Sequence, residues 1–102
     1  MNATMTSSKR TVVMGQSGSV ESGRVSWRAS YSQDGESMDL WGEAFETAEG
    51  RWRMTRTRTR MVDGHREPAG APVVTTHASG EAARAEMVAM VEIITGREVR
   101  II

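Results

Sequence analysis

The chain has 102 residues, which suits one domain with a single modest core. Its thirteen basic residues balance thirteen acidic ones, so net charge gives the protein no general attraction to polyanions, and a basic surface requires like charges to gather on one face. The chain contains no cysteine, which excludes disulfides, thiolate chemistry and zinc sites of the Cys-containing kind.

The N-terminal segment, residues 1–10, is small and polar and has no hydrophobic periodicity. We expect it to be a disordered tail that precedes a single domain over residues 11–102. The segment lacks the apolar core of a secretory signal, and no apolar run in the chain is long enough to cross a bilayer. The sequence therefore predicts a cytoplasmic protein with no membrane partner.

The first part of the domain predicts two strands. Residues 11–14 favour a short strand, and the glycines and serines of residues 15–23 are typical of a loop. Residues 24–32 alternate between apolar and polar side chains, which predicts a half-buried strand with Trp27 and Tyr31 on its covered side.

A hairpin turn is predicted at Asp34-Gly35, because a type I′ turn needs positive φ at both of its central residues. The next strand would then run from residue 38 to about residue 48. A two-residue turn here places Trp27 opposite Gly42, so a large side chain lies beside a small one.

The next strand is predicted over residues 51–61, RWRMTRTRTRM, which include five arginines. Residue types alternate along this stretch, and successive side chains of a strand point to opposite faces of the sheet. A two-residue turn at Glu49-Gly50 would set three carboxylates of the preceding strand opposite arginines, at about 0.2–1 kcal/mol for each pair. A three-residue turn would instead place Arg53 opposite Phe45 and lose these pairs, so we expect the shorter turn. The expected pairs are Glu46 with Arg53, Glu43 with Arg56, Trp41 with Arg58 and Asp39 with Arg60.

In that register, one face of the sheet is apolar and the other is rich in arginine and aromatic side chains. No predicted element covers the second face, and aromatic residues and arginine are enriched at interaction hot spots. We therefore expect this face to bind a partner. The candidate contact residues are Arg24, Arg28, Trp41, Phe45, Trp52, Met54, Arg56, Arg58 and Arg60.

The C-terminal part of the chain begins with a predicted turn at Asp63-Gly64, followed by a loop over residues 65–72. Residues 73–77 are mostly β-branched and predict a further strand. Residues 98–102 predict a last strand at a sheet edge.

Between these two strands the sequence predicts a helix that is capped by Ser79, carries Glu81 in its first turn and stops at Gly96. An apolar stripe at helical spacing is expected to pack on the apolar face of the sheet as core. The stripe consists of Ala83, Met87, Met90, Val91 and Ile94. The small residues expected beneath it are Gly42, Ala44, Thr55 and Thr57.

No catalytic set is predicted. His65 lies in a turn and His77 lies beside a helix cap, and neither has a second ligand at metal-binding spacing. Asp39 and Glu43 could form a carboxylate pair for acid–base or metal chemistry, but each is expected to have an arginine partner, which suits an ion pair better. We expect a protein that is not an enzyme, with no catalytic residues, no cofactor and no metal site.

The sequence thus predicts an α+β domain with an antiparallel meander of three long strands, one or two shorter strands and a C-terminal helix on one sheet face. The opposite face would bind, and can inhibit, a protein partner such as a nucleic-acid-handling enzyme. Phage-encoded inhibitors of defence nucleases share this form, although no motif supports the comparison. Direct binding of single-stranded nucleic acid is the first alternative, because bases stack on aromatic rings and guanidinium groups contact phosphates. A homodimer with a solvated charged face is the second.

Overall fold

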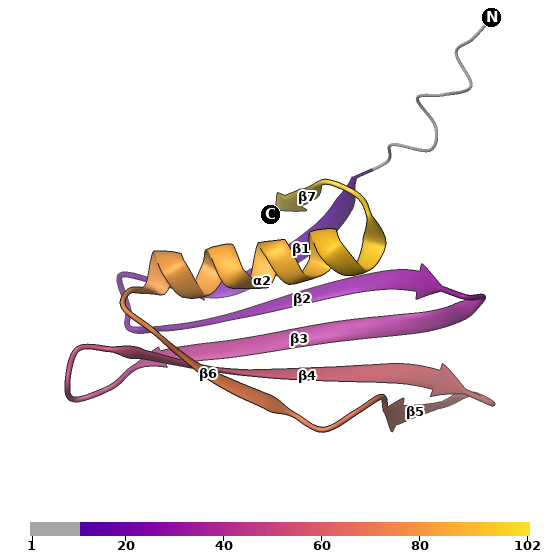
Figure 1. The fold of residues 1–102 in the computed structure, drawn as a ribbon, viewed down its shortest axis with the longest axis horizontal. Coiled ribbons are helices and arrows are strands. Elements are labelled where there is room, and N and C mark those ends of the chain that lie inside the picture. Colours follow the sequence, from indigo (N-terminus) through magenta and orange to yellow (C-terminus); the bar gives the residue numbers. More distant parts are fainter. Residues whose placement is uncertain (1–10) are drawn as a thin grey trace, which may run out of the picture.

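The computed structural model describes residues 11–102, in which a seven-stranded, mostly antiparallel sheet lies beside one helix (Figure 1). The elements are β1 (Val12–Ser19), β2 (Arg24–Gln33), β3 (Glu36–Glu46), β4 (Trp52–Val62), β5 (His65–Pro68), β6 (Val73–His77), α2 (Gly80–Thr95) and β7 (Val99–Ile101). The predicted α+β class with an antiparallel sheet is confirmed. The tail predicted for residues 1–10 lies outside the described residues.

The strands are ordered β5-β4-β3-β2-β1-β7 across the sheet. β6 returns to the outer edge of β4, where it pairs with residues 52–56 while β5 pairs with residues 59–62. β7 pairs in parallel with β1 at the opposite edge, as expected for the last strand. The strand β5 was not predicted, because residues 65–72 were expected to be a loop.

The first strand is longer than expected, because residues 15–19 belong to β1 and not to a loop. Gly15 pairs with Arg28 and Ser17 pairs with Ser26, so backbone hydrogen bonding to β2 continues where the apolar pattern has ended. Small polar side chains are compatible with a strand when one face of the sheet meets solvent.

The hairpin between β2 and β3 has the predicted turn and register. Asp34 and Gly35 have φ values of 54° and 80°, as a type I′ turn requires. Trp27 lies opposite Gly42, and Tyr31 lies opposite Met38. This turn therefore determines which face each side chain of the two strands occupies.

The predicted register between β3 and β4 is wrong by one residue. Phe45 lies opposite Arg53, and Glu46 lies opposite Trp52. The turn is also different, because Thr47 N–H donates to the carbonyl oxygen of Arg51 at 2.7 Å. A shift of one residue moves every side chain of a strand to the other face of the sheet.

The observed register is favoured because it buries two large apolar side chains. Trp52 is 4% exposed and Met54 is fully buried, both on the face that packs against α2. Burying a side chain of this size contributes about 1.5–3 kcal/mol, whereas an exposed cross-strand ion pair contributes about 0.2–1 kcal/mol. The expected ion pairs were therefore too weak to fix the register.

The helix lies over the sheet where the sheet offers small side chains. A Cβ atom on Gly42 would lie 2.6 Å from the Sδ atom of Met87, so glycine allows a close approach there. Ala83, Met87 and Val91 of α2 are fully buried. The expectation that Thr55 and Thr57 lie beneath the helix is wrong, because the shifted register turns them to the other face.

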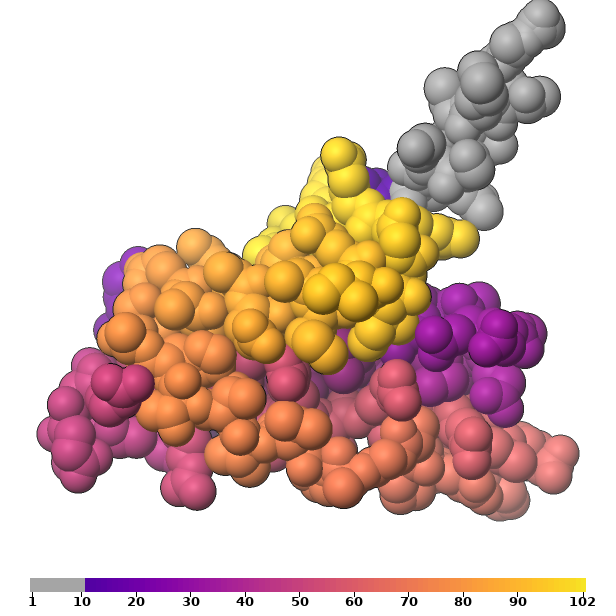
Figure 2. All heavy atoms as spheres, viewed as in Figure 1, coloured from indigo at the N-terminus to yellow at the C-terminus, as the bar shows by residue number. Residues whose placement is uncertain are grey.

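Both ends of α2 are capped as the sequence predicts. The Ser79 hydroxyl oxygen accepts a hydrogen bond from Ala82 N–H at 3.0 Å, and Gly96 ends the helix with φ of 68°. Figure 2 shows the helix lying over the sheet, while the ends of the β2–β3 and β4–β5 hairpins extend past it.

Candidate functional site

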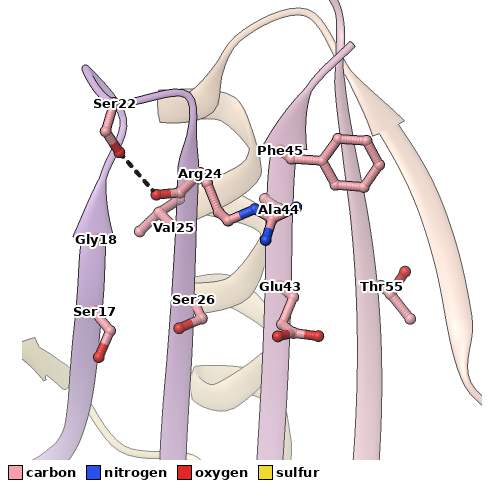
Figure 3. A pocket seen from close by; sticks show the side chains of 10 residues that line it. All are labelled: Ser17, Gly18, Ser22, Arg24, Val25, Ser26, Glu43, Ala44, Phe45 and Thr55. Atoms are coloured by element: carbon pink, nitrogen blue, oxygen red, sulfur yellow. Dashed lines mark hydrogen bonds between the residues drawn. The ribbon is translucent and has the colours of Figure 1, made fainter.

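The face of the sheet opposite α2 is called the open face here, because no element within residues 11–102 covers it (Figures 1 and 3). Figure 3 views this face with the helix behind the strands. The register places on it Val13, Ser17, Arg24, Ser26, Arg28, Ser30, Asp39, Trp41, Glu43, Phe45, Arg53, Thr55, Thr57, Thr59, Met61, Arg66, Val74 and Arg100.

The carboxylate of Asp39 organises the centre of the open face. It is 3% exposed, and its Oδ2 atom lies 3.0 Å from Nη2 of Arg28. Arg66, from β5, forms a second ion pair with the same oxygen, and the Ser30 hydroxyl donates to Oδ1. Arg66 also donates to the Thr59 hydroxyl at 3.2 Å. Asp39, on β3, thus joins β2 and β5, and Arg66 extends the network to β4.

These contacts keep Asp39 ionised. Burial by itself would raise the pKa of the Asp39 carboxyl group, but the hydrogen bonds from Ser30 and Arg28 and the charges of Arg28 and Arg66 outweigh it and leave the pKa below its ordinary value. A carboxyl group with this environment serves as a structural anion. Asp39 pairs with arginine as expected. Its partners are Arg28 and Arg66, and not Arg60.

Arg28 connects this buried anion to an exposed aromatic ring. Its guanidinium carbon lies 4.9 Å from the centre of the Trp41 ring, and Trp41 is 38% exposed. A guanidinium group at that distance is attracted to the face of an indole ring. Trp41 was expected to pair with Arg58, which instead lies on the other face of the sheet.

A groove of about 510 Å³ lies on the open face near the turn between β1 and β2 (Figure 3). Its lining includes Ser17, Arg24, Ser26, Glu43, Phe45 and Thr55. Within residues 11–102, neither Arg24 nor Glu43 forms an ion pair. The groove therefore offers one free charge of each sign beside Phe45, a residue that is 39% exposed.

Four of the nine predicted contact residues lie on the open face: Arg24, Arg28, Trp41 and Phe45. The assignment of the other five to this face is wrong, because the shifted register turns them towards the helix side. These are Trp52, Met54, Arg56, Arg58 and Arg60. Trp52 and Met54 belong to the core, and Arg56 forms an ion pair with Glu86 of α2 at 2.9 Å, not with Glu43.

The ion-pair roles of two residues on this face, Asp39 and Arg66, were not predicted. Asp39 was placed on the correct face, but its role as the common partner of two arginines was not foreseen. Arg66 was missed because residues 65–72 were expected to be a loop. The hairpin signal at Asp63-Gly64 could have suggested a returning strand, and these residues have φ values of 50° and 80°.

Within residues 11–102, neither histidine forms an ion pair with a carboxylate. His77 lies 2.8 Å from the Thr75 hydroxyl, and His65 is exposed on β5. Over residues 11–102, no group of three His, Cys, Asp or Glu side chains is arranged to hold a metal ion.

Comparison with known proteins found no matching family model, curated protein or solved structure. In the described part of the chain, no helix is long and apolar enough to span a membrane. The residues of the open face are therefore the basis for a functional proposal.

Proposed function

We propose that this protein is a non-catalytic binding protein that engages a protein partner through the open face of its sheet. The observation that carries the proposal is the pair Trp41 and Phe45. The two side chains lie on the same side of β3, four residues apart, and more than a third of each residue is exposed. Large aromatic side chains grouped on an uncovered surface are typical of interaction sites.

The surface around Trp41 is held in place before any partner arrives. Asp39 fixes the guanidinium group of Arg28, and that group lies over the Trp41 ring. Binding costs less conformational entropy when the contact side chains are already ordered. We therefore assign Trp41 the role of central anchor, with Phe45 as the second apolar contact.

The charges of the open face favour a protein over a nucleic acid. Glu43 lies among the arginines, and Asp39 neutralises part of the charge of Arg28 and Arg66. The observed register also removes Arg56, Arg58 and Arg60 from this face. Nucleic-acid affinity depends on the number of phosphates that a surface neutralises. Three of the arginines that could neutralise phosphates are therefore absent from the open face. A partner that displays both charge signs would complement Arg24 and Glu43. One such partner is a nucleic-acid-handling enzyme, which the contact would inhibit.

Direct binding of single-stranded nucleic acid is the competing hypothesis, and one observation favours it. The open-face arginines, Arg24, Arg28, Arg53, Arg66 and Arg100, outnumber the carboxylates Asp39 and Glu43. If this hypothesis is correct, a labelled single strand should bind at low salt and dissociate steeply as salt rises.

The test is affinity capture from an extract of the organism that encodes the protein, after nuclease treatment. The captured protein is then purified and its affinity measured by calorimetry for the parent chain and for Trp41→Ala/Phe45→Ala. Loss of two anchors should weaken binding at least about thirtyfold. Ile93→Ala is the matched control, because Ile93 is an exposed apolar side chain, 77% accessible, on α2 and away from the open face.

The proposal fails if capture depends on intact nucleic acid, or if Ile93→Ala weakens binding as much as the double variant does. Equal affinity of the double variant and the parent chain would also contradict it, because the two rings would then make no contact.

A further inference from the structure

A second concave site lies on the helix side of the sheet, between α2 and the segment that joins β5 to β6. Its volume is about 240 Å³. The side chains that line it include Leu40, Arg56, Arg58, Val73, Met90 and Ile94. The pocket therefore contains Arg56 and Arg58 of β4, which were expected to lie on the open face.

The walls of this pocket are largely aliphatic. Leu40 is 4% exposed and belongs to the core beneath the pocket. Met90 and Ile94 are four residues apart, so they lie on the same side of α2, and both pack against the core while remaining partly exposed. The walls can thus pack against a short apolar group.

The two arginines of the pocket differ in how their charge is balanced. Nη1 of Arg56 lies 2.9 Å from Oε2 of Glu86, so Arg56 has a counter-ion. Arg58 has none within residues 11–102, and its Nε atom donates to the carbonyl oxygen of Ala69 at 3.3 Å. That acceptor is neutral, so the charge of Arg58 is left without a counter-ion.

The side chain of Arg58 is neither fully exposed nor fully buried. A charge that is partly removed from water and not paired is unfavourable, and an anion that reaches it gains a strong interaction. No hydrogen bond to the described residues occupies the terminal nitrogens of Arg58. A guanidinium group with free terminal nitrogens matches the two oxygens of a carboxylate.

We infer that this pocket binds a small monocarboxylate with a short aliphatic body. The carboxylate pairs with Arg58, and the aliphatic body lies against Met90 and Ile94. One uncompensated guanidinium group among aliphatic walls suits a singly charged ligand better than a phosphate, which carries more charge and no apolar part. The volume of about 240 Å³ lies just below the usual range for drug-sized ligands, so it suits a small molecule.

The experiment is a titration of the whole chain with hexanoate, followed by NMR of the methyl groups of methionine and isoleucine. Hexanoate should shift the Met90 and Ile94 methyl resonances, with a dissociation constant on the order of 1 mM for a ligand of this size. Hexan-1-ol, which has the same aliphatic chain and no charge, should bind at least about tenfold more weakly.

Two variants test the role of the guanidinium group. Arg58→Met removes the charge, keeps an apolar stem and should weaken hexanoate binding at least about tenfold. Arg53→Met makes the same change on the same strand but on the open face, so hexanoate binding should be unchanged.

The inference is overturned if hexanoate leaves the Met90 and Ile94 resonances unmoved, or if hexan-1-ol binds as tightly as hexanoate. It is also overturned if a folded Arg58→Met variant binds hexanoate as the parent does. Should Arg58→Met fail to fold, the comparison between hexanoate and hexan-1-ol decides alone. None of these results bears on the open face, because the pocket lies on the other side of the sheet.

Discussion

Arg53 lies opposite Phe45, and this one cross-strand pairing determines which face of the sheet receives each side chain of β4. It turns the threonines of the strand towards the open face and the arginines from Arg56 onwards towards α2. Trp52 then becomes a core residue at the start of the strand.

The first prediction concerns this division of β4. Trp52→Ala should lower the free energy of unfolding by about 3–5 kcal/mol, because it removes a buried ring and leaves a cavity. Arg53→Ala, one residue along and exposed, should change it by less than about 0.5 kcal/mol. Urea denaturation of both variants gives the comparison. If the two variants unfold at similar denaturant concentrations, the register of β4 is not the one described.

The second prediction concerns the approach of the helix to the sheet. Gly42→Ala should destabilise the protein by about 1–3 kcal/mol, because the new methyl group would meet the Met87 side chain. In a Met87→Ala background the same change should cost little, since the space is then free. A double-mutant cycle measured by thermal melting reports the coupling. Additive effects of the two changes would show that the residues do not touch.

The third prediction is a pH dependence that originates in Asp39. Its pKa is lower in the folded protein than its ordinary value of 3.8, so the unfolded chain binds the proton more tightly. Asp39 therefore contributes stability that is fully present above its ordinary pKa and is lost as pH falls through the folded pKa. Between about pH 5 and pH 2 the parent chain should lose more stability than Asp39→Asn does.

The same variant has a defined effect at neutral pH. Asp39→Asn should destabilise the protein at pH 7, because Arg28 and Arg66 lose their shared anion. Both arginines remain partly exposed to water, so the loss should be limited to about 1–3 kcal/mol. Denaturant unfolding across the pH range measures both effects. Parallel stability curves for Asp39→Asn and the parent would show that Asp39 does not carry the dependence.

The parts of the fold that could be predicted are those with a strong local signal. Asp34-Gly35 admits essentially one kind of hairpin turn, so the register of β2 and β3 followed from it. Ser79 and Gly96 are local signals of the same strength for the ends of the helix, because each helps to satisfy backbone groups that a helix end leaves free. The residues of the open face that were placed correctly, Arg28 and Trp41 among them, belong to this hairpin.

The parts that could not be predicted depend on contacts between distant residues. The turn from β3 to β4 has no comparable signal, so its register had to be judged from ion pairs that are weaker than the burial of Trp52. Arg56 and Glu86 are 30 residues apart in the sequence, and no local pattern links them. Arg66 reaches Asp39 only because β5 folds back beside β4.

Hydroxyl-radical footprinting of the free chain and of its complex with the captured partner tests the role of the open face most directly. Trp41 and Phe45 are exposed on that face, while Ile93 is exposed on α2 and is the internal control. The complex should protect Trp41 and Phe45 from oxidation and leave Ile93 as reactive as in the free chain. Protection of Ile93 with no change at Trp41 and Phe45 would place the partner on α2 and show that the open face is not the binding surface.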